Sequence, residues 1–120
     1  MRCEYCKLPS RVHLAPFQID HIIARQHEGV TVLSNLALSC LHCNVRRGPN
    51  IAGIDNATGE VIRLFNPRTD AWSQHFVLVG AILRGLTPIG RVTIHVLGMN
   101  EADFVDVRSA LIEEQVFETD

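Results

Sequence analysis

The sequence predicts a small α+β domain whose first half is fastened by a bound metal ion. Four cysteines occur as two tight Cys-x-x-Cys pairs. Short apolar segments bounded by Gly, Pro and Asx residues have the composition of strands, and other segments carry helix-capping signals. With 120 residues and 47% hydrophobic side chains, the chain can build one domain with a core.

The cysteine pairs have the spacing of zinc ligands. Two thiolates separated by two residues can bind one ion from a single turn, and two such pairs complete a tetrahedral site. This site is closed because it leaves no free coordination position, so we predict a structural Zn²⁺. The 33 residues between the pairs leave room for a strand, a loop and a second strand. The predicted ligands are Cys3, Cys6, Cys40 and Cys43.

The predicted compartment also favours metal over disulfides. The chain has no run of about 18 apolar residues, and Met1-Arg2-Cys3 leads straight into the metal motif without a secretory signal. We therefore expect no membrane association and a cytoplasmic location, where thiols stay reduced. Three alternatives stay open: two disulfides in a secreted domain, an iron–sulfur cluster or redox pair, and a site in which His13 or His42 replaces one cysteine.

The first half of the chain predicts two strands, a loop and a helix around these cysteines. Residues 17–19 alternate apolar and polar, as a short strand does, and residues 36–39 form a second one. Residues 24–34 lack periodicity and are expected to form a loop. Residues 41–47 are predicted to form a brief helix, because a Gly-Pro pair follows and stops it.

The second half predicts an extension of short strands and two helices. Asn100 is expected to cap the last helix, whose packing face would carry Phe104, Val107, Leu111 and Ile112. The elements before it are a turn over 55–60 with a strand over 61–65, a helical turn over 70–76, a hairpin or bulge around 77–83, and a helix from Pro88 to about Leu97.

Charge is spread unevenly along the chain, whose net charge is −2. Residues 1–68 carry eight basic and five acidic side chains, whereas residues 69–120 carry three and eight. A surface that binds phosphate is therefore expected only on the first half. The candidate phosphate contacts are Arg25 in the loop and Arg46 and Arg47, which we expect to project from the short helix.

Polar residues follow a distinctive order around the cysteine pairs: Asp20-His21, then Asn35, then Asn44 directly after the second pair. This order resembles the HNH endonuclease family, strongly over residues 3–53, and residues 61–100 look like the tail of small bacterial HNH proteins. The resemblance implies a ββα-metal, treble-clef-like core with a four-cysteine zinc site. It also implies hydrolysis of DNA phosphodiester bonds.

The resemblance assigns a role to each of these polar residues. Phosphodiester hydrolysis needs an activated water and a positive centre at the phosphate. His21 would activate the water, because an imidazole titrates near neutral pH. Asp20 and Asn44 would hold Mg²⁺ or Mn²⁺ through oxygen atoms, although the family has His at the position of Asn44. Asn35 would orient the base or tie down the loop.

Strand geometry places one condition on these roles. Adjacent residues on a regular strand point to opposite faces, so Asp20 and His21 would not both face one phosphate. The resemblance implies that they lie where the strand ends, and a bend there can turn both inward.

These observations predict a nuclease core over 1–53 and an extension over 54–120 packed on it as one compact domain. Phosphate contacts without an evident base-reading helix imply weak sequence specificity, and one site per chain favours nicking. DNA is the expected substrate; RNA, a homodimer and a protein partner stay open. The rival hypothesis is a non-catalytic zinc module that binds nucleic acid or protein, in which Asp20 and His21 play structural roles.

Overall fold

The first half of the chain forms the strand–strand–helix unit that the sequence predicts. The computed structural model describes residues 1–12 and 15–119. Strands β1 (Gln18–His21) and β2 (Leu36–Ser39) pair antiparallel, and helix α1 (Leu41–Arg47) follows β2 at once. The predicted bounds of β2 and α1 are confirmed, and β1 extends past the predicted strand to include the Asp-His pair.

Local interactions explain why α1 begins and ends where it does. Cys40 is its N-cap, and the Cys40 sulfur accepts a hydrogen bond from the backbone N–H of Cys43 at 3.4 Å. Gly48 follows the last turn with φ 51°, a backbone conformation that costs glycine little, and its N–H donates to the Asn44 carbonyl. The helix therefore starts on one cysteine of the second pair and buries the other.

The connection between β1 and β2 is a structured loop. It contains two 3₁₀ turns, η2 (Arg25–His27) and η3 (Leu33–Asn35), while a third turn, η1 (Ser10–Val12), lies before β1. Gly29 lies so close to the backbone of Ile23 that a Cβ atom there would be 1.7 Å from the Ile23 carbonyl oxygen. Only glycine fits this close approach, which folds the loop back on the end of β1.

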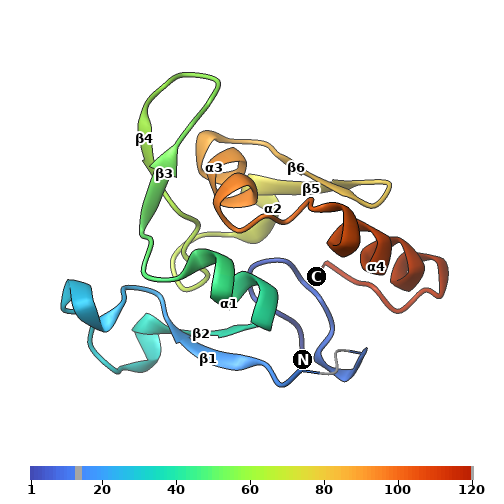
Figure 1. Cartoon of the computed structure of the whole chain (residues 1–120), viewed down its shortest axis with the longest axis horizontal. Helices are drawn as coiled ribbons and strands as arrows, with labels where there is room; N and C mark the ends of the chain where they lie inside the picture. Colours follow the sequence, from blue (N-terminus) through green and yellow to red (C-terminus); the bar gives the residue numbers. More distant parts are fainter. Residues whose placement is uncertain (13–14, 120) are drawn as a thin grey trace.

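The second half adds two more hairpins and three helices. Figure 1 shows β3, β4, β5, β6 and α3 on one side of the ββα unit, with α4 at the edge nearer the C-terminus. The hairpins are β3 (Ala52–Ile54) with β4 (Val61–Arg63), and β5 (Phe76–Val79) with β6 (Ile82–Gly85); the helices are α2 (Trp72–His75), α3 (Pro88–Val96) and α4 (Ala102–Glu113).

Most of the elements predicted for this half are confirmed. The turn before β4, the helical turn at α2 and the hairpin of β5 with β6 all form. Thr87 caps α3, because its hydroxyl accepts a hydrogen bond from the N–H of Gly90 at 3.1 Å and Pro88 occupies the first turn.

Two predictions for the last helix are wrong. Asn100 does not cap α4, because the N-cap residue is Glu101. The Asn100 side chain instead bonds the backbone N–H and C=O of Leu83 at 2.9 and 2.7 Å. Val107 is 47% exposed, and the buried position next to it is Arg108, which donates to the carbonyls of Ala81 and Met99. The side chains of Asn100 and Arg108 thus hydrogen-bond backbone groups of the β5–β6 hairpin, and helical periodicity does not predict such contacts.

The two halves share one hydrophobic core. Tyr5 packs edge-on against Phe65 with ring centroids 6.4 Å apart, and Phe65 packs in the same way against Phe76 at 5.2 Å. The Trp72 indole donates to the Tyr5 carbonyl at 2.7 Å. The extension therefore covers the cysteine turn of the first half.

Among the described residues, no helix has both the length and the apolar content needed to cross a membrane.

Candidate metal centre and active site

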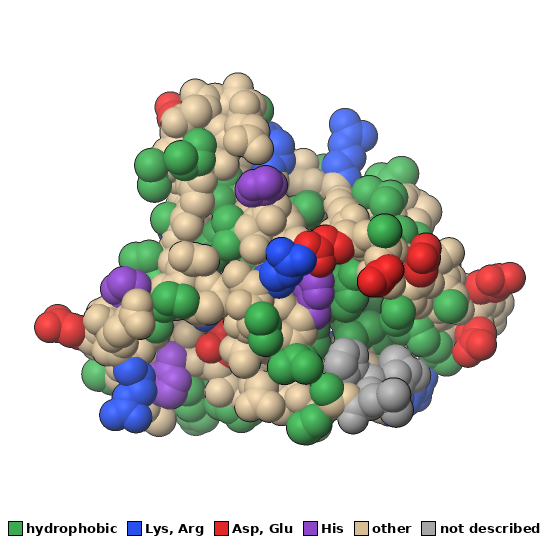
Figure 2. Space-filling model, viewed as in Figure 1, with side chains coloured by type: hydrophobic (Ala, Val, Ile, Leu, Met, Phe, Trp, Pro, Cys, Tyr) green, Lys and Arg blue, Asp and Glu red, His purple; other side chains and the backbone are tan. Residues whose placement is uncertain are grey.

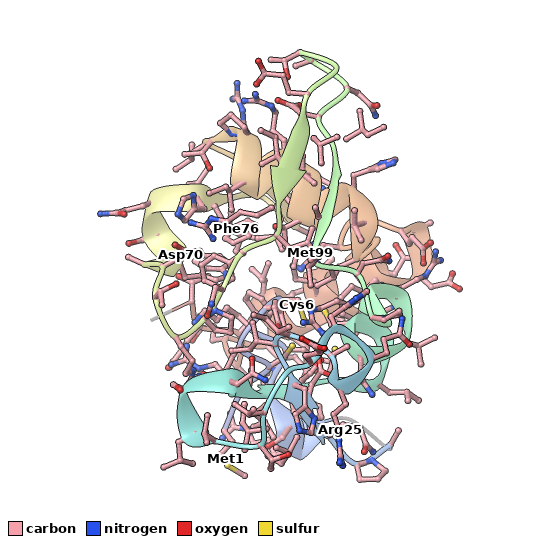
Figure 3. All side chains as sticks on the ribbon, turned by 90° about the vertical axis from the view of Figure 1, so that its left-hand side faces the viewer. Met1, Cys6, Arg25, Asp70, Phe76 and Met99 are labelled. Atoms are coloured by element: carbon pink, nitrogen blue, oxygen red, sulfur yellow. The ribbon has the colours of Figure 1, made fainter. Side chains whose placement is uncertain are left out.

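The four cysteines converge in the interior of the first half. All of their sulfur atoms lie within 4.8 Å of one another, and each residue is at most 1% exposed. The Cys6 and Cys40 sulfurs are 3.7 Å apart, close to the roughly 3.8 Å between ligands that surround zinc tetrahedrally at about 2.3 Å. Figure 3 shows sulfur atoms gathered around the labelled Cys6 inside the molecule. The cluster therefore fits a closed zinc site.

Histidine does not complete this cluster in the described part of the chain. The His42 ring stacks on Phe104 with centroids 4.2 Å apart, and its Nε2 lies 3.0 Å from the Gly98 carbonyl oxygen. His42 thus joins α1 to the start of α4. The other histidine considered as a ligand, His13, lies outside the described residues.

The thiols of the cluster differ in how readily they ionise. Burial raises the pKa of Cys6 well above its ordinary value. The pKa of Cys43 is also raised, mainly by its hydrogen bond with Cys3 and then by those with the other two thiols. Burial also opposes ionisation of Cys3, but hydrogen bonds with the other three cysteines lower its pKa well below the ordinary value. Metal binding must therefore release protons from the group, which makes affinity fall in acid.

Asp20 and His21 lie at the end of β1, as the resemblance implies. Asp20 pairs with Ala37 and His21, the last residue of the strand, with Leu36; the chain bends immediately afterwards. Their side chains have different partners. Asp20 Oδ2 accepts from Arg47, while His21 Nε2 is hydrogen-bonded to the Thr31 hydroxyl at 2.8 Å.

Arg47 lies beneath this strand end and is only 2% exposed. Its Nη1 donates to Asp20 Oδ2 at 2.7 Å and its Nη2 donates to the His21 carbonyl at 3.0 Å. Its guanidinium carbon lies 5.8 Å from the centre of the Tyr5 ring. The expectation that Arg47 projects outward for phosphate is therefore wrong, because the last turn of α1 faces β1 and buries this side chain.

The Asp20 carboxyl balances two opposing effects. Burial of the Asp20 carboxyl raises its pKa above the ordinary value, although the Arg47 guanidinium beside it lowers the pKa.

Asn44 precedes Arg47 by three residues on α1, so the two side chains share the helix face that packs towards β1. The carboxylate oxygen and the amide oxygen proposed as metal ligands therefore belong to facing elements.

Asn35 ties the loop to the end of β1. Its Oδ1 accepts from the N–H of Ile23 at 2.8 Å, and its Nδ2 donates to the carbonyls of Ile23 and Val30 at 3.0 and 2.9 Å. The side chain is 9% exposed. Because Thr31 follows Val30 directly, Asn35 indirectly places the hydroxyl that contacts His21.

Replacing Asn35 by alanine is expected to lower the free energy of unfolding by about 2–3 kcal/mol, because three backbone groups lose their partners. Urea unfolding would measure the change. The exposed neighbour Ser34 provides a matched control, and its replacement by alanine should change stability by less than about 0.5 kcal/mol. Equal effects of the two substitutions would contradict this role of Asn35.

The other two arginines predicted to contact phosphate lie on the surface. Arg25 is exposed in η2, and Figure 3 labels it near the lower edge of the molecule. Arg46 is 47% exposed and forms an ion pair with Glu101 at the start of α4. Figure 2 shows acidic side chains gathered over α4, whereas the basic side chains on that face are scattered. A phosphate at Arg46 would therefore compete with a carboxylate.

Sequence reasoning missed two residues of this site. Thr31 contacts His21 from an aperiodic loop, and nothing in the sequence pattern marks it. Tyr5 lies between the first two cysteines, and its buried hydroxyl has no hydrogen-bond partner among the described residues. Burial raises the pKa of Tyr5 to about 12. An aromatic residue between paired cysteines was the available signal that this turn packs inward.

Comparisons with known proteins gave one family match and one similar protein. The family model for HNH endonuclease matches residues 3–50. The chain is also similar to the Septu protein PtuB of Bacillus thuringiensis, with 26% identity over 120 residues, which cover 98% of this chain and 44% of the relative. The chain thus spans less than half the length of that relative. No solved structure gives a significant match.

Proposed function

Because residues 3–50 match the family model for HNH endonuclease, we propose that the chain is a metal-dependent endonuclease that hydrolyses DNA phosphodiester bonds. One observation carries the proposal. The Asp20-His21 pair ends β1 against α1, whose Arg47 contacts both residues, and the four-cysteine cluster fastens the start of α1 to the N-terminal turn. Nuclease activity is what the family supports, and the roles of individual residues are part of our proposal.

His21 acts as the general base in this proposal. Its ring is partly exposed, and its Nε2 is held by the Thr31 hydroxyl, which restricts the ring orientation. In its neutral form the imidazole takes a proton from the attacking water. Asn35 contributes by holding the loop that carries Thr31.

Asp20 and Asn44 supply the oxygen ligands for a divalent ion. One carboxylate and one amide do not make a complete cage, but they suit Mg²⁺ or Mn²⁺, which keep several waters and add substrate phosphate to their shell. When bound, the ion supplies the positive charge that stabilises the transition state. Arg25 and Arg46 are the surface groups in reach of flanking phosphates in this proposal.

The proposal includes a mode of cleavage. A single site per chain cuts one strand at a time, so nicking is the expected product. Phosphate contacts from a short loop and a short helix carry no base information, so we expect weak sequence specificity unless a protein partner adds it. A homodimer would place two sites on one duplex and could cut both strands. RNA stays open as a second substrate, so the cleavage assay includes both nucleic acids.

A specific observation supports the second candidate function, a non-catalytic zinc module. Asp20 already has a buried cationic partner in Arg47, so its carboxylate has a structural reason to be there. A module of this kind would bind nucleic acid or protein through the same surface without cleaving it.

Incubation with supercoiled plasmid distinguishes the two functions. The zinc-loaded protein is expected to convert plasmid to the nicked form with Mg²⁺ or Mn²⁺, and EDTA added just before the reaction should stop it. Folded, zinc-containing protein that leaves plasmid, single-stranded DNA and RNA intact with several divalent metals would refute the nuclease proposal. Retention of DNA under those conditions would favour the binding module.

A further inference from the structure

We propose that Arg47 is a positioning residue that acts as the internal counter-ion of Asp20, so that the site accepts a divalent ion together with a phosphate group and poorly without one. The inference rests on the proposed function, because it assumes that Asp20 is a metal ligand. It adds a coupling between metal and substrate at that same site.

The contacts of Arg47 show that it belongs to the site rather than to the surface. It donates to the carboxylate of Asp20 and to the backbone carbonyl of His21, so one side chain holds both members of the pair. Arg47 is 2% exposed and the Asp20 side chain 14% exposed. Water therefore screens their interaction weakly, and the ion pair is strongly coupled.

This arrangement makes the resting site electrically neutral. Asp20 contributes one negative charge and Arg47 one positive charge, while Asn44 is uncharged and the His21 ring is neutral when it serves as a base. A divalent ion bound at Asp20 would lie close to the guanidinium and be repelled by it. Hard cations bind proteins mainly through anionic oxygens, so the affinity of the site alone should be low.

A phosphodiester supplies the charge that the site lacks. Its oxygens can enter the shell of the ion and also accept hydrogen bonds from a guanidinium, whose planar fork suits phosphate. Arg47 also lines a cavity of about 220 Å³ whose walls include Ile22, Ile51 and Phe65. This cavity offers the guanidinium space to shift when an ion and a phosphate arrive together.

The first experiment measures Mn²⁺ binding to zinc-loaded protein without nucleic acid, by the loss of the free Mn²⁺ electron paramagnetic resonance signal. Arg47→Gln is expected to bind Mn²⁺ roughly tenfold more tightly than wild type, because the competing charge is gone. Arg47→Lys keeps the charge and should stay near wild type. Asp20→Asn in the Arg47→Gln background should abolish the gain. Equal or weaker binding by Arg47→Gln would overturn the proposal.

The second experiment needs no Arg47 variant, so it remains decisive if that variant fails to fold. Anisotropy would measure the affinity of wild type for a fluorescent 12-nucleotide DNA with phosphorothioate linkages, which resist cleavage. Mn²⁺ should strengthen binding about tenfold, since coupling between two ligands is reciprocal, and Asp20→Asn should show no gain. Non-specific screening by Mn²⁺ acts in the opposite direction. Unchanged or weaker wild-type binding would refute the coupling.

The outcomes separate this inference from the proposed function. If wild type and Arg47→Gln bind Mn²⁺ equally well at one site that requires Asp20, the metal site stands and only the role of Arg47 is refuted. If neither protein binds Mn²⁺, with or without DNA, the metal site at Asp20 and the coupling fail together.

Discussion

Replacing His21 by alanine is expected to reduce plasmid nicking by at least about 100-fold, the usual contribution of a general base. The alanine side chain cannot take the proton from the attacking water. Because the described side-chain contact of His21 is a single exposed hydrogen bond to Thr31, the substitution should leave the fold intact. Initial rates of nicking at saturating Mg²⁺ or Mn²⁺ would measure the loss.

A matched substitution controls for the removal of an imidazole. His95 is exposed on α3, outside the candidate site, so His95→Ala should nick plasmid at the wild-type rate. Zinc content, melting temperature and DNA retention should be the same in both variants and wild type. A His21→Ala protein that still nicks at more than about a tenth of the wild-type rate would contradict the assignment of His21 as the base.

Replacing Cys6 by serine is expected to abolish stoichiometric zinc binding and unfold the first half of the chain. Structural zinc sites contribute roughly 10–16 kcal/mol of binding free energy, which equals or exceeds the total stability of an ordinary domain. Cys6 is buried with its sulfur 3.7 Å from that of Cys40, so a serine hydroxyl would replace one of the four thiolate ligands. Elemental analysis and circular dichroism would measure zinc and fold.

Zinc removal from wild type provides the control for this substitution. Chelation should unfold the same region, and added Zn²⁺ should restore the wild type but not Cys6→Ser. The chain has four cysteines, all of them free thiols in this structure. Two disulfides would instead give no zinc and no titratable thiols after denaturation, and that result would refute the metal centre.

Elements with local signals were predictable from the sequence. The bounds of β2 and α1 follow from a short apolar segment and from the Gly-Pro stop, and Thr87-Pro88 marks the start of α3. Each depends on residues a few positions apart, whose preferences act wherever the segment lies. The metal cluster was predictable for the same reason, because the Cys-x-x-Cys spacing itself places two thiolates on one ion.

Side chains whose partners lie far along the chain were not predictable in this way. Asn100 is a residue type that commonly caps helices. Its side chain instead bonds the backbone of Leu83 in β6, which lies next to it in the fold. Val107 is exposed and the next residue, Arg108, is buried, because the Arg108 guanidinium donates to the Ala81 carbonyl in the β5–β6 turn. Satisfying buried backbone groups outweighs the periodic pattern of the helix at these positions.

The sequence alone determined the order of the candidate site residues: four thiols in two pairs, an Asp-His pair, and two asparagines. Only the tertiary structure decided that Arg47 turns inward to Asp20 while Arg46 turns outward to Glu101. Neighbouring residues on a helix point in different directions, and the surface that each one meets depends on how α1 packs on β1 and α4. The charge of the candidate site is therefore a property of the packing, which local sequence preferences do not encode.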